Sequence, residues 1–356
     1  MTGAAGRLLD VGEIARMLDA RVETVVLDVL PDGRRHGHEW VARCPWRIDK
    51  RPGSFLVHLS GAKSGMWHDF ATKEGGDTLD LVAKALFGGD KRTAIRWALR
   101  FLGLENGDPV ALEQVRRATP SPEQISATAQ VEAAQTRGQA FRIWLAAEPR
   151  IADTPVDHYL RGRGIHLAEL SRQPRALRYH PALWHRDSNR KWPAMVALIA
   201  AADGKFAAVH RTWLEVQANG SVTKAPLGKM TKMTLGEYSG GSIRLWRGAS
   251  KKSLNDAPEG EIVDITEGIE DGLSVACAVP ESRVLAAVSL ANIANVALPA
   301  AIKGVRLWRQ NDTAPETIRA FDKAACAHLV AGRDVFIPPI PDDLKDVNDL
   351  MRTDAH

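Results

Sequence analysis

The sequence predicts a multidomain protein that combines α/β and α+β folds. Its last hundred residues alternate strand-like and helical patterns, which is typical of a parallel sheet flanked by helices. Residues 177–216 instead alternate apolar and polar side chains around turn sequences, which is typical of an antiparallel sheet. At 356 residues the chain is also long for one hydrophobic core, so we expect two or three domains.

The composition is that of an ordinary soluble protein. Hydrophobic residues make up 45% and charged residues 25% of the chain. No apolar run approaches the length of a membrane span, and the N-terminus lacks the apolar core of a signal peptide. Cys44, Cys277 and Cys326 are widely spaced, which favours a reducing cytoplasm without disulfides. The pI near 9.0 permits a polyanionic partner but does not require one.

The N-terminal hundred residues predict a compact domain, 1–104, followed by a linker or helical connector, 105–135. Helical and strand-like patterns follow one another at 11–18 (helix), 22–30 (a β-branched stretch), 38–44 and 54–59 (strands), and 78–87 and 93–102 (helices). Residues 105–126 are polar and punctuated by proline, so we expect a linker there.

A middle domain, 136–258, is expected to be mixed α+β. Helical patterns cover 127–147 and 156–161, and the antiparallel sheet follows. Residues 219–241 are rich in glycine, threonine and lysine, which favours a mobile or ligand-ordered loop.

The last domain, 259–356, should present acidic residues at one edge of its sheet. Strands are expected at 262–266, 284–288, 305–308 and 335–338, with helices at 271–278, 293–298 and 316–331. Glu267 follows the first strand, Asp271 lies one helical turn later, and Asp312 and Asp346 follow later strands. Because parallel strands end at a common edge, these carboxylates should converge. Such a set favours a magnesium or manganese site for phosphoryl chemistry.

Nucleotide-hydrolysis and dinucleotide motifs are not found in this sequence. Neither Gly-x-x-x-x-Gly-Lys-Ser/Thr nor Gly-x-Gly-x-x-Gly occurs at a strand end. We therefore expect that the sequence does not encode a helicase motor.

Residues 260–351 resemble a Toprim domain, the metal-binding module of bacterial-type DNA primases, topoisomerases and some nucleases. Glu267 matches the family's glutamate after the first strand, and Asp271 an acid on the following helix. Asp312 matches the second acid of the family's Asp-x-Asp pair, and residues 345–349, Lys-Asp-Val-Asn-Asp, resemble a closing motif of phage and plasmid primases. Gln310 stands where the first aspartate of that pair is expected, which should lower metal affinity.

The N-terminal domain resembles the zinc-binding domain that precedes Toprim in primases. The matching stretches are Cys44–Arg47, Asp49–Phe55, Trp67–Phe70 and Gly75–Asp77. Arg47 replaces a histidine ligand, and Trp67–Phe70 lies where a Cys-x-x-Cys pair is expected. A closed zinc site needs four ligands, so we expect a zinc-ribbon-like fold without zinc, with Trp40, Trp46, Trp67 and Phe70 in its core.

The resemblance implies a magnesium-dependent DNA primase that makes RNA primers on single-stranded DNA from ribonucleotides, in phage, plasmid or mobile-element replication. A separately encoded replicative helicase would be its partner. Asp312 and Asp346 would be the main metal ligands, Asp271 and Asn348 would complete or orient the shell, and Glu267 would be a ligand or general base. Phosphates would be contacted by the basic residues of the middle domain, Arg163, Arg211, Lys224, Lys229 and Lys232.

Less specific interpretations stay open at this point. Glu267 could be an exposed turn residue, and Asp271 a carboxylate at the start of a helix. Asp346 and Asp349 could be solvated acids near the C-terminus, and the lysines could belong to a solvated loop. His38 and His68 could still bind zinc beside Cys44. A Toprim nuclease would use the same acids, and a weakened nucleic-acid-binding protein would explain Gln310. A topoisomerase is disfavoured because the tyrosines lack the separate domain that carries its nucleophile.

Overall fold

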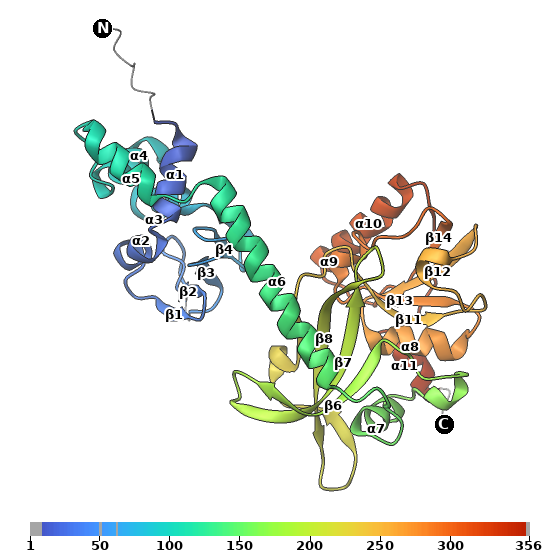
Figure 1. Ribbon diagram of the computed structural model, residues 1–356. Coiled ribbons are helices and arrows are strands. Elements are labelled where there is room, and N and C mark those ends of the chain that lie inside the picture. Colours follow the sequence, from blue (N-terminus) through green and yellow to red (C-terminus); the bar gives the residue numbers. More distant parts are fainter. Residues whose placement is uncertain (1–8, 50–51, 62, 354–356) are drawn as a thin grey trace. The chain divides into compact units, whose positions relative to one another are not determined.

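The computed structural model describes residues 9–49, 52–61 and 63–353 (Figure 1). The chain divides into two compact units, an N-terminal unit, 1–132, and a C-terminal unit, 133–356. Lys50 and Arg51 of the expected zinc-domain motif lie outside the described residues. In the described part of the chain, no helix is both long and apolar enough to cross a membrane.

The described residues of the N-terminal unit include a five-stranded antiparallel sheet and several helices, which confirms the prediction of a β-rich N-terminal region. The strands follow the chain order, β1 (Arg34–His36), β2 (Glu39–Ala42), β3 (Phe55–His58), β4 (Trp67–Asp69) and β5 (Glu74–Gly76). The helices are α1 (Val11–Asp19), α2 (Val22–Val29), α3 (Thr78–Phe87), α4 (Lys91–Phe101) and α5 (Pro109–Ala118).

Three expectations for this unit need correction. The β-branched stretch 22–30 is helix α2, whose valines at 22, 25, 26 and 29 are buried at helical spacing. The expected linker 105–126 contains α5, which Asp108 caps through a 2.8 Å bond from the Val110 N–H. Phe70 is 57% exposed and is not a core residue.

Three aromatic side chains of this sheet and of the loop between β2 and β3 pack together. The rings of Trp46, Phe55 and Trp67 lie 5.1–5.6 Å apart, centroid to centroid, and Trp67 is 2% exposed. Asp77 caps α3 by accepting the Asp80 N–H. Trp67 is thus a core residue, as expected, whereas Trp40 and Trp46 are partly buried and pack against that core.

An ion pair occupies the region where the resemblance places the zinc ligands. The Arg47 guanidinium donates two bonds to the Asp69 carboxylate, with Nε–Oδ2 2.8 Å and Nη2–Oδ1 3.0 Å. It also donates to the Ser54 hydroxyl at 2.6 Å and lies 3.2 Å from Asp49. The Asp69 side chain is fully buried, and Arg47 lowers the pKa of its carboxyl group to about 2. Cys44 could supply one thiolate here, but a tetrahedral zinc site needs four ligands and a guanidinium is not one of them. This arrangement therefore does not fit zinc.

The C-terminal unit begins with an antiparallel sheet whose strand order is β10-β8-β7-β6, with β9 paired to β8. Its strands are β6 (Leu177–His185), β7 (Arg190–Ala200), β8 (Phe206–Val216), β9 (Val222–Lys224) and β10 (Lys232–Leu235). The second half of α6 (Pro122–Ala146) packs on this sheet through Trp144, beside Trp192 and Trp213. Helix α7 (Pro155–Arg161) follows it. The antiparallel sheet expected within 177–216 is therefore confirmed.

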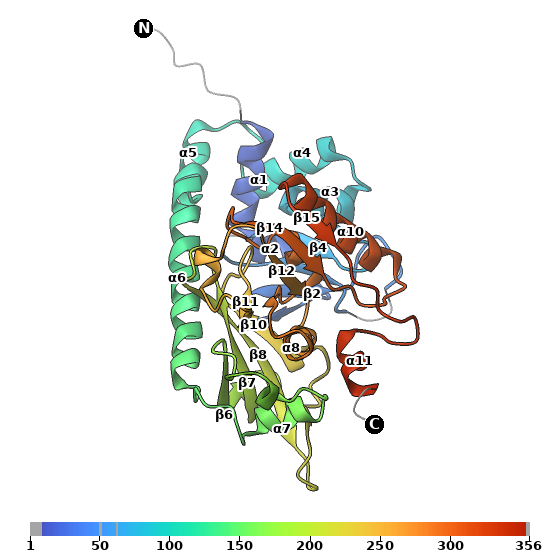
Figure 2. The ribbon, with the colours of Figure 1, turned by 90° about the vertical axis from the view of Figure 1, so that its right-hand side faces the viewer.

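The second sheet of this unit has the order β11-β13-β12-β14-β15; β11, β12, β14 and β15 are labelled in Figure 2. Strands β12 (Glu261–Thr266), β13 (Arg283–Ala286), β14 (Ile302–Leu307) and β15 (Asp334–Phe336) are parallel, and β11 (Ile243–Arg247) is antiparallel to β13. The helices are α8 (Ile269–Ala278), α9 (Leu290–Ile293), α10 (Pro315–Val330) and α11 (Val347–Thr353). The predicted parallel sheet with flanking helices is confirmed.

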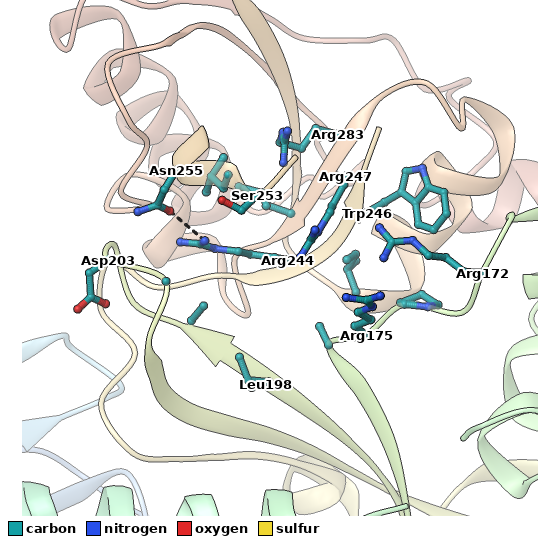
Figure 3. Close-up of a pocket in the computed structure, with 17 residues that line it drawn as sticks. Arg172, Arg175, Leu198, Asp203, Arg244, Trp246, Arg247, Ser253, Asn255 and Arg283 are labelled. Carbon is teal, nitrogen blue, oxygen red and sulfur yellow. Dashed lines mark hydrogen bonds between the residues drawn. The ribbon is translucent and has the colours of Figure 1, made fainter. Parts of the chain in front are cut away.

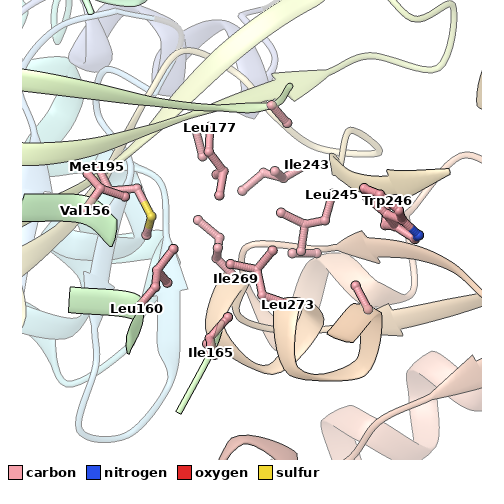
Figure 4. Packing of buried hydrophobic residues seen from close by; sticks show 14 of the residues in the cluster. Val156, Leu160, Ile165, Leu177, Met195, Ile243, Leu245, Trp246, Ile269 and Leu273 are labelled. Carbon is pink, nitrogen blue, oxygen red and sulfur yellow. The ribbon is translucent and has the colours of Figure 1, made fainter. Parts of the chain in front are cut away.

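Two hydrophobic clusters cover the two faces of this sheet. On one face, α8 packs Ile269 and Leu273 against Leu177 and Met195 of the antiparallel sheet (Figure 4). On the other face, Phe321 of α10 belongs to a cluster with α9 and the parallel strands. A helix was expected at 293–298, but α9 ends at Ile293.

Candidate functional site

The turn after β12 places Glu267 at the edge where the parallel strands end, here called the carboxyl edge. β12 ends one residue before Glu267, and α8 begins two residues after it. Gly272 lets α8 lie close to the sheet, because a Cβ there would come within 2.5 Å of Leu245 and 2.9 Å of the Thr266 hydroxyl. Glu267 is half-buried, and burial raises the pKa of its carboxyl group.

Asp312 lies in the segment after β14, which Asn311 ties to the segment after β15. The Asn311 amide donates to the carbonyls of Pro341 and Leu344 at 2.9 and 2.8 Å, and its backbone N–H donates to Lys345 at 2.7 Å. Asp312 is exposed and lines a small pocket together with Glu267. Its charge raises the pKa of Glu267 further.

Asp346 directly precedes α11, and Asn348 holds that helix against the rest of the unit. The Asp346 carboxylate accepts the Asp349 N–H at 3.0 Å, which is an N-capping bond. Asn348 is fully buried, and its amide donates to the Arg163 carbonyl at 2.9 Å and to the Ser274 hydroxyl at 3.0 Å. These bonds give Asn348 a structural role in connecting α11 to α8.

Asp271 lies on α8 and is bonded to Gln310, the residue that replaces the expected aspartate. The Gln310 amide nitrogen donates to Asp271 Oδ2 at 3.2 Å. Asp271 is 6% exposed. Burial, followed by the Asp346 charge, raises the pKa of Asp271 to about 6. An aspartate at position 310 would instead place another negative charge beside Asp271.

The structure therefore brings the predicted acids together in two pairs. Glu267 interacts with Asp312, and Asp271 with Asp346. Within the described ranges, no three His, Cys, Asp or Glu side chains gather closely enough to hold a metal ion. The acids share the carboxyl edge but do not form a ready-made metal cluster.

Glu270 is a buried acid that sequence reasoning missed. It is 4% exposed. Its carboxylate accepts a 2.7 Å bond from the Tyr159 hydroxyl and lies 3.0 Å from the Lys232 ammonium and 3.3 Å from that of Lys224. Burial alone would raise the pKa of Glu270, but the two ammonium groups and the hydroxyl lower it overall. The one signal for Glu270 in the sequence was its position between Glu267 and Asp271. Its partner Tyr159 is 111 residues away, so the sequence does not indicate that they meet.

Two of the predicted phosphate-binding lysines are thus engaged with Glu270. Lys229 is exposed on the short helical turn Gly228–Thr231. The Arg211 guanidinium lies over the Trp213 ring at 5.0 Å, and burial lowers the pKa of Arg211 to about 10. Arg163 is half-buried. Burial and the Glu270 carboxylate raise the pKa of Tyr159 overall, and the nearby Arg163 charge opposes that rise. The expected basic residues are therefore mostly engaged with partners inside the protein, while Lys229 and part of the Lys224 side chain are exposed.

A cavity of about 300 Å³ joins the carboxyl edge to the antiparallel sheet. Glu267 and Gln310 lie on one wall, and His210, Lys232 and Tyr238 on the other. Burial and the Lys232 charge lower the pKa of His210 to about 4, so it is neutral at pH 7. The cavity therefore presents a carboxylate opposite an ammonium group, a combination suited to a ligand that carries both phosphates and bound cations.

Two family models match the C-terminal unit. Residues 263–356 match the model described as Toprim domain. This part of the chain is a Toprim domain. Residues 134–245, which contain the antiparallel sheet, match a model described as Domain of unknown function (DUF7146). The comparison with curated proteins gave no match.

Similar solved structures include three primase structures. The zinc-binding and RNA polymerase domains of the Aquifex aeolicus primase are 15% identical, with 95% of this chain and 82% of that chain covered and a TM-score of 0.36. The E. coli primase catalytic core is 16% identical, with 62% and 75% covered and a TM-score of 0.39. The primase fragment of the bacteriophage T7 primase-helicase protein is 15% identical, with 55% and 70% covered and a TM-score of 0.35.

Proposed function

We propose that the chain is a magnesium-dependent, primase-like nucleotidyltransferase that makes RNA primers on single-stranded DNA. The observation that carries this proposal is the cavity between Glu267 of the Toprim domain and Lys232 of the antiparallel sheet. The degenerate zinc-domain motif before the Toprim domain supports it by its order along the chain. Ribonucleotides and a template strand would be the ligands, and a separate replicative helicase the partner.

In the proposed reaction, the 3′-hydroxyl of the primer attacks the α-phosphate of an incoming ribonucleotide. The new bond joins the 3′-oxygen to that phosphorus, and the bond to pyrophosphate breaks. The hydroxyl proton would pass to water at the site, because Glu267 would itself be a metal ligand. Lys232 would lie beside the phosphates once they compete with Glu270 for its ammonium group.

The carboxyl edge fits a magnesium ion held by few protein ligands. Magnesium is commonly bound through one or two carboxylates, with water and substrate phosphates completing its shell. Glu267 and Asp312 would hold one ion, with Asp271 and Asp346 as the second pair of acids. When bound, the ion would stabilise negative charge on the attacking and leaving oxygens.

Replacing Glu267 by glutamine or Asp312 by asparagine should reduce primer synthesis about 100-fold or more. Synthesis would be measured on single-stranded template with labelled ribonucleotides and magnesium. Glu259→Gln and Asp334→Asn are matched controls, because both residues are exposed and lie away from the carboxyl edge. Wild-type-like synthesis by both site variants would contradict the proposal. Magnesium-dependent DNA cutting without nucleotides would instead indicate a Toprim nuclease.

A catalytically weakened nucleic-acid-binding protein is the second candidate, and the Gln310–Asp271 bond favours it. Gln310 adds no charge to the site, and its amide occupies one oxygen of Asp271. Under this alternative, Gln310→Asp should strengthen magnesium binding about tenfold or more and increase primer synthesis. Isothermal titration with magnesium and the synthesis assay would measure both effects. Glu259→Asp provides the control on an exposed acid.

A further inference from the structure

A second cavity of the C-terminal unit, about 380 Å³ in volume, is lined by arginines (Figure 3). It lies between β7, β11 and β13, and none of the acids of the carboxyl edge lines it. Arg247 on β11 pairs in register with Arg283, the first residue of β13. The cavity therefore reaches the end of the sheet where the parallel strands begin, opposite to the carboxyl edge.

Five guanidinium groups line this cavity, together with one carboxylate, that of Asp203. Asp203 is already paired with Lys205 at 3.0 Å. Arg283 is paired with Glu261 and donates to Ser250 and the Lys252 carbonyl, so its charge is balanced. The remaining four arginines are Arg172, Arg175, Arg244 and Arg247, here called the arginine pocket.

The arginine pocket holds more positive charge than its protein neighbours neutralise. In the described part of the chain, no ion pair within 4.0 Å joins any of its four arginines to a carboxylate. Arg244 donates to the Asn255 side chain at 3.0 Å and to the Ala201 carbonyl at 3.0 Å, while its Nε is buried without a partner. Burial, followed by the charges of Arg247 and Arg175, lowers the pKa of Arg172.

Two of these arginines are fixed in position without being neutralised. The Arg172 guanidinium lies over the Trp246 ring at 5.4 Å, and Trp246 is itself anchored by a 2.6 Å bond from its Nε1 to the Pro280 carbonyl. Arg247 donates to the Lys251 carbonyl at 3.3 Å. Guanidinium groups that are oriented but lack counter-ions are preorganised for a multivalent oxyanion, since their planar forks match phosphate oxygens.

We infer that the arginine pocket binds a phosphate ester, at a site separate from the carboxyl edge. The cavity volume lies within the range of small-ligand sites. The phosphate could be supplied by a free nucleotide or by a DNA strand, and the two sources share the same recognition chemistry. This site does not depend on magnesium or on the proposed activity.

The test is a binding titration of the full chain in the presence of EDTA, which removes magnesium-dependent binding at the carboxyl edge. The probes are ATP and a short oligothymidylate. Arg172→Gln/Arg247→Gln should weaken binding of at least one probe about tenfold or more. The control Arg150→Gln/Arg319→Gln removes the same charge from exposed positions of the same unit and should leave binding within about twofold.

Loss with both probes would identify a site for any phosphate ester, and loss with oligothymidylate alone would identify a strand-backbone site. The variant Arg172→Lys/Arg247→Lys keeps the charge but removes the forks, so it should also bind more weakly than the control. Unchanged binding by the glutamine variant, equal loss in the control, or no binding of either probe by the wild type would overturn the inference. Thermal unfolding of each variant checks that the fold is retained.

Discussion

Replacing Glu270 by glutamine should destabilise the C-terminal unit by about 2–3 kcal/mol, since Glu270 is buried but its two lysine partners are partly exposed to water. The change leaves the ammonium groups of Lys224 and Lys232, each about half-buried, beside a buried neutral amide. It also weakens the acceptor of the Tyr159 hydroxyl. Urea unfolding followed by tryptophan fluorescence would measure the change in the free energy of unfolding.

The triple variant Glu270→Leu/Lys224→Met/Lys232→Met should recover much of that loss, because it removes all the charges together. Glu281→Gln, at an exposed position of the same domain, is the control and should change stability by less than about 0.5 kcal/mol. An effect of Glu270→Gln as small as that of the control would mean that the network does not hold the antiparallel sheet to α8.

Replacing Asp69 by asparagine should destabilise the N-terminal unit by about 3 kcal/mol, because it leaves the half-buried Arg47 guanidinium without its bidentate partner. The same unit should be insensitive to metal chelators. Asp32→Asn is the control, since its carboxylate is largely exposed. Two results would contradict the view that this ion pair replaces a metal. One is an unfolding transition, thermal or in urea, that EDTA shifts; the other is a transition that Asp69→Asn leaves unchanged.

The pH dependence of this unit follows from the same ion pair. The pKa of Asp69 is lowered from 3.8 to about 2 in the folded state. Its contribution to stability is therefore fully present above about pH 4 and is lost as the pH falls toward 2. Asp69→Asn should show a smaller loss of stability over that interval than the wild type. Urea midpoints measured at several pH values between 2 and 5 would test this, and parallel curves for the two proteins would contradict it.

The fold was predictable where one structural period continued over a whole element. The parallel strands and the long antiparallel strands show this, because their apolar runs are buried as the patterns indicate. Helix α2 was obscured by its valines, which have high strand propensity but whose spacing buries one helical face. Helix α5 was obscured by proline, although Pro109 stands at the first helical turn, where proline is well tolerated.

The position of the acids could be predicted from strand ends, but their partners could not. Glu270 was overlooked because its partners come from α7, β9 and β10, and only the folded chain shows that they meet. The same holds for Arg47 and Asp69, which the sequence marks as departures from a zinc-site pattern without indicating that they pair. The bond between Gln310 and Asp271 is likewise a tertiary contact.

Crystals grown with manganese would test most directly whether the carboxyl edge is a metal-dependent site. Anomalous scattering should place an ion within ligand distance of Glu267 and Asp312, and Asp312→Asn should remove or weaken that peak. Manganese bound only elsewhere, or a peak at the carboxyl edge that neither acid contacts, would contradict the proposed site.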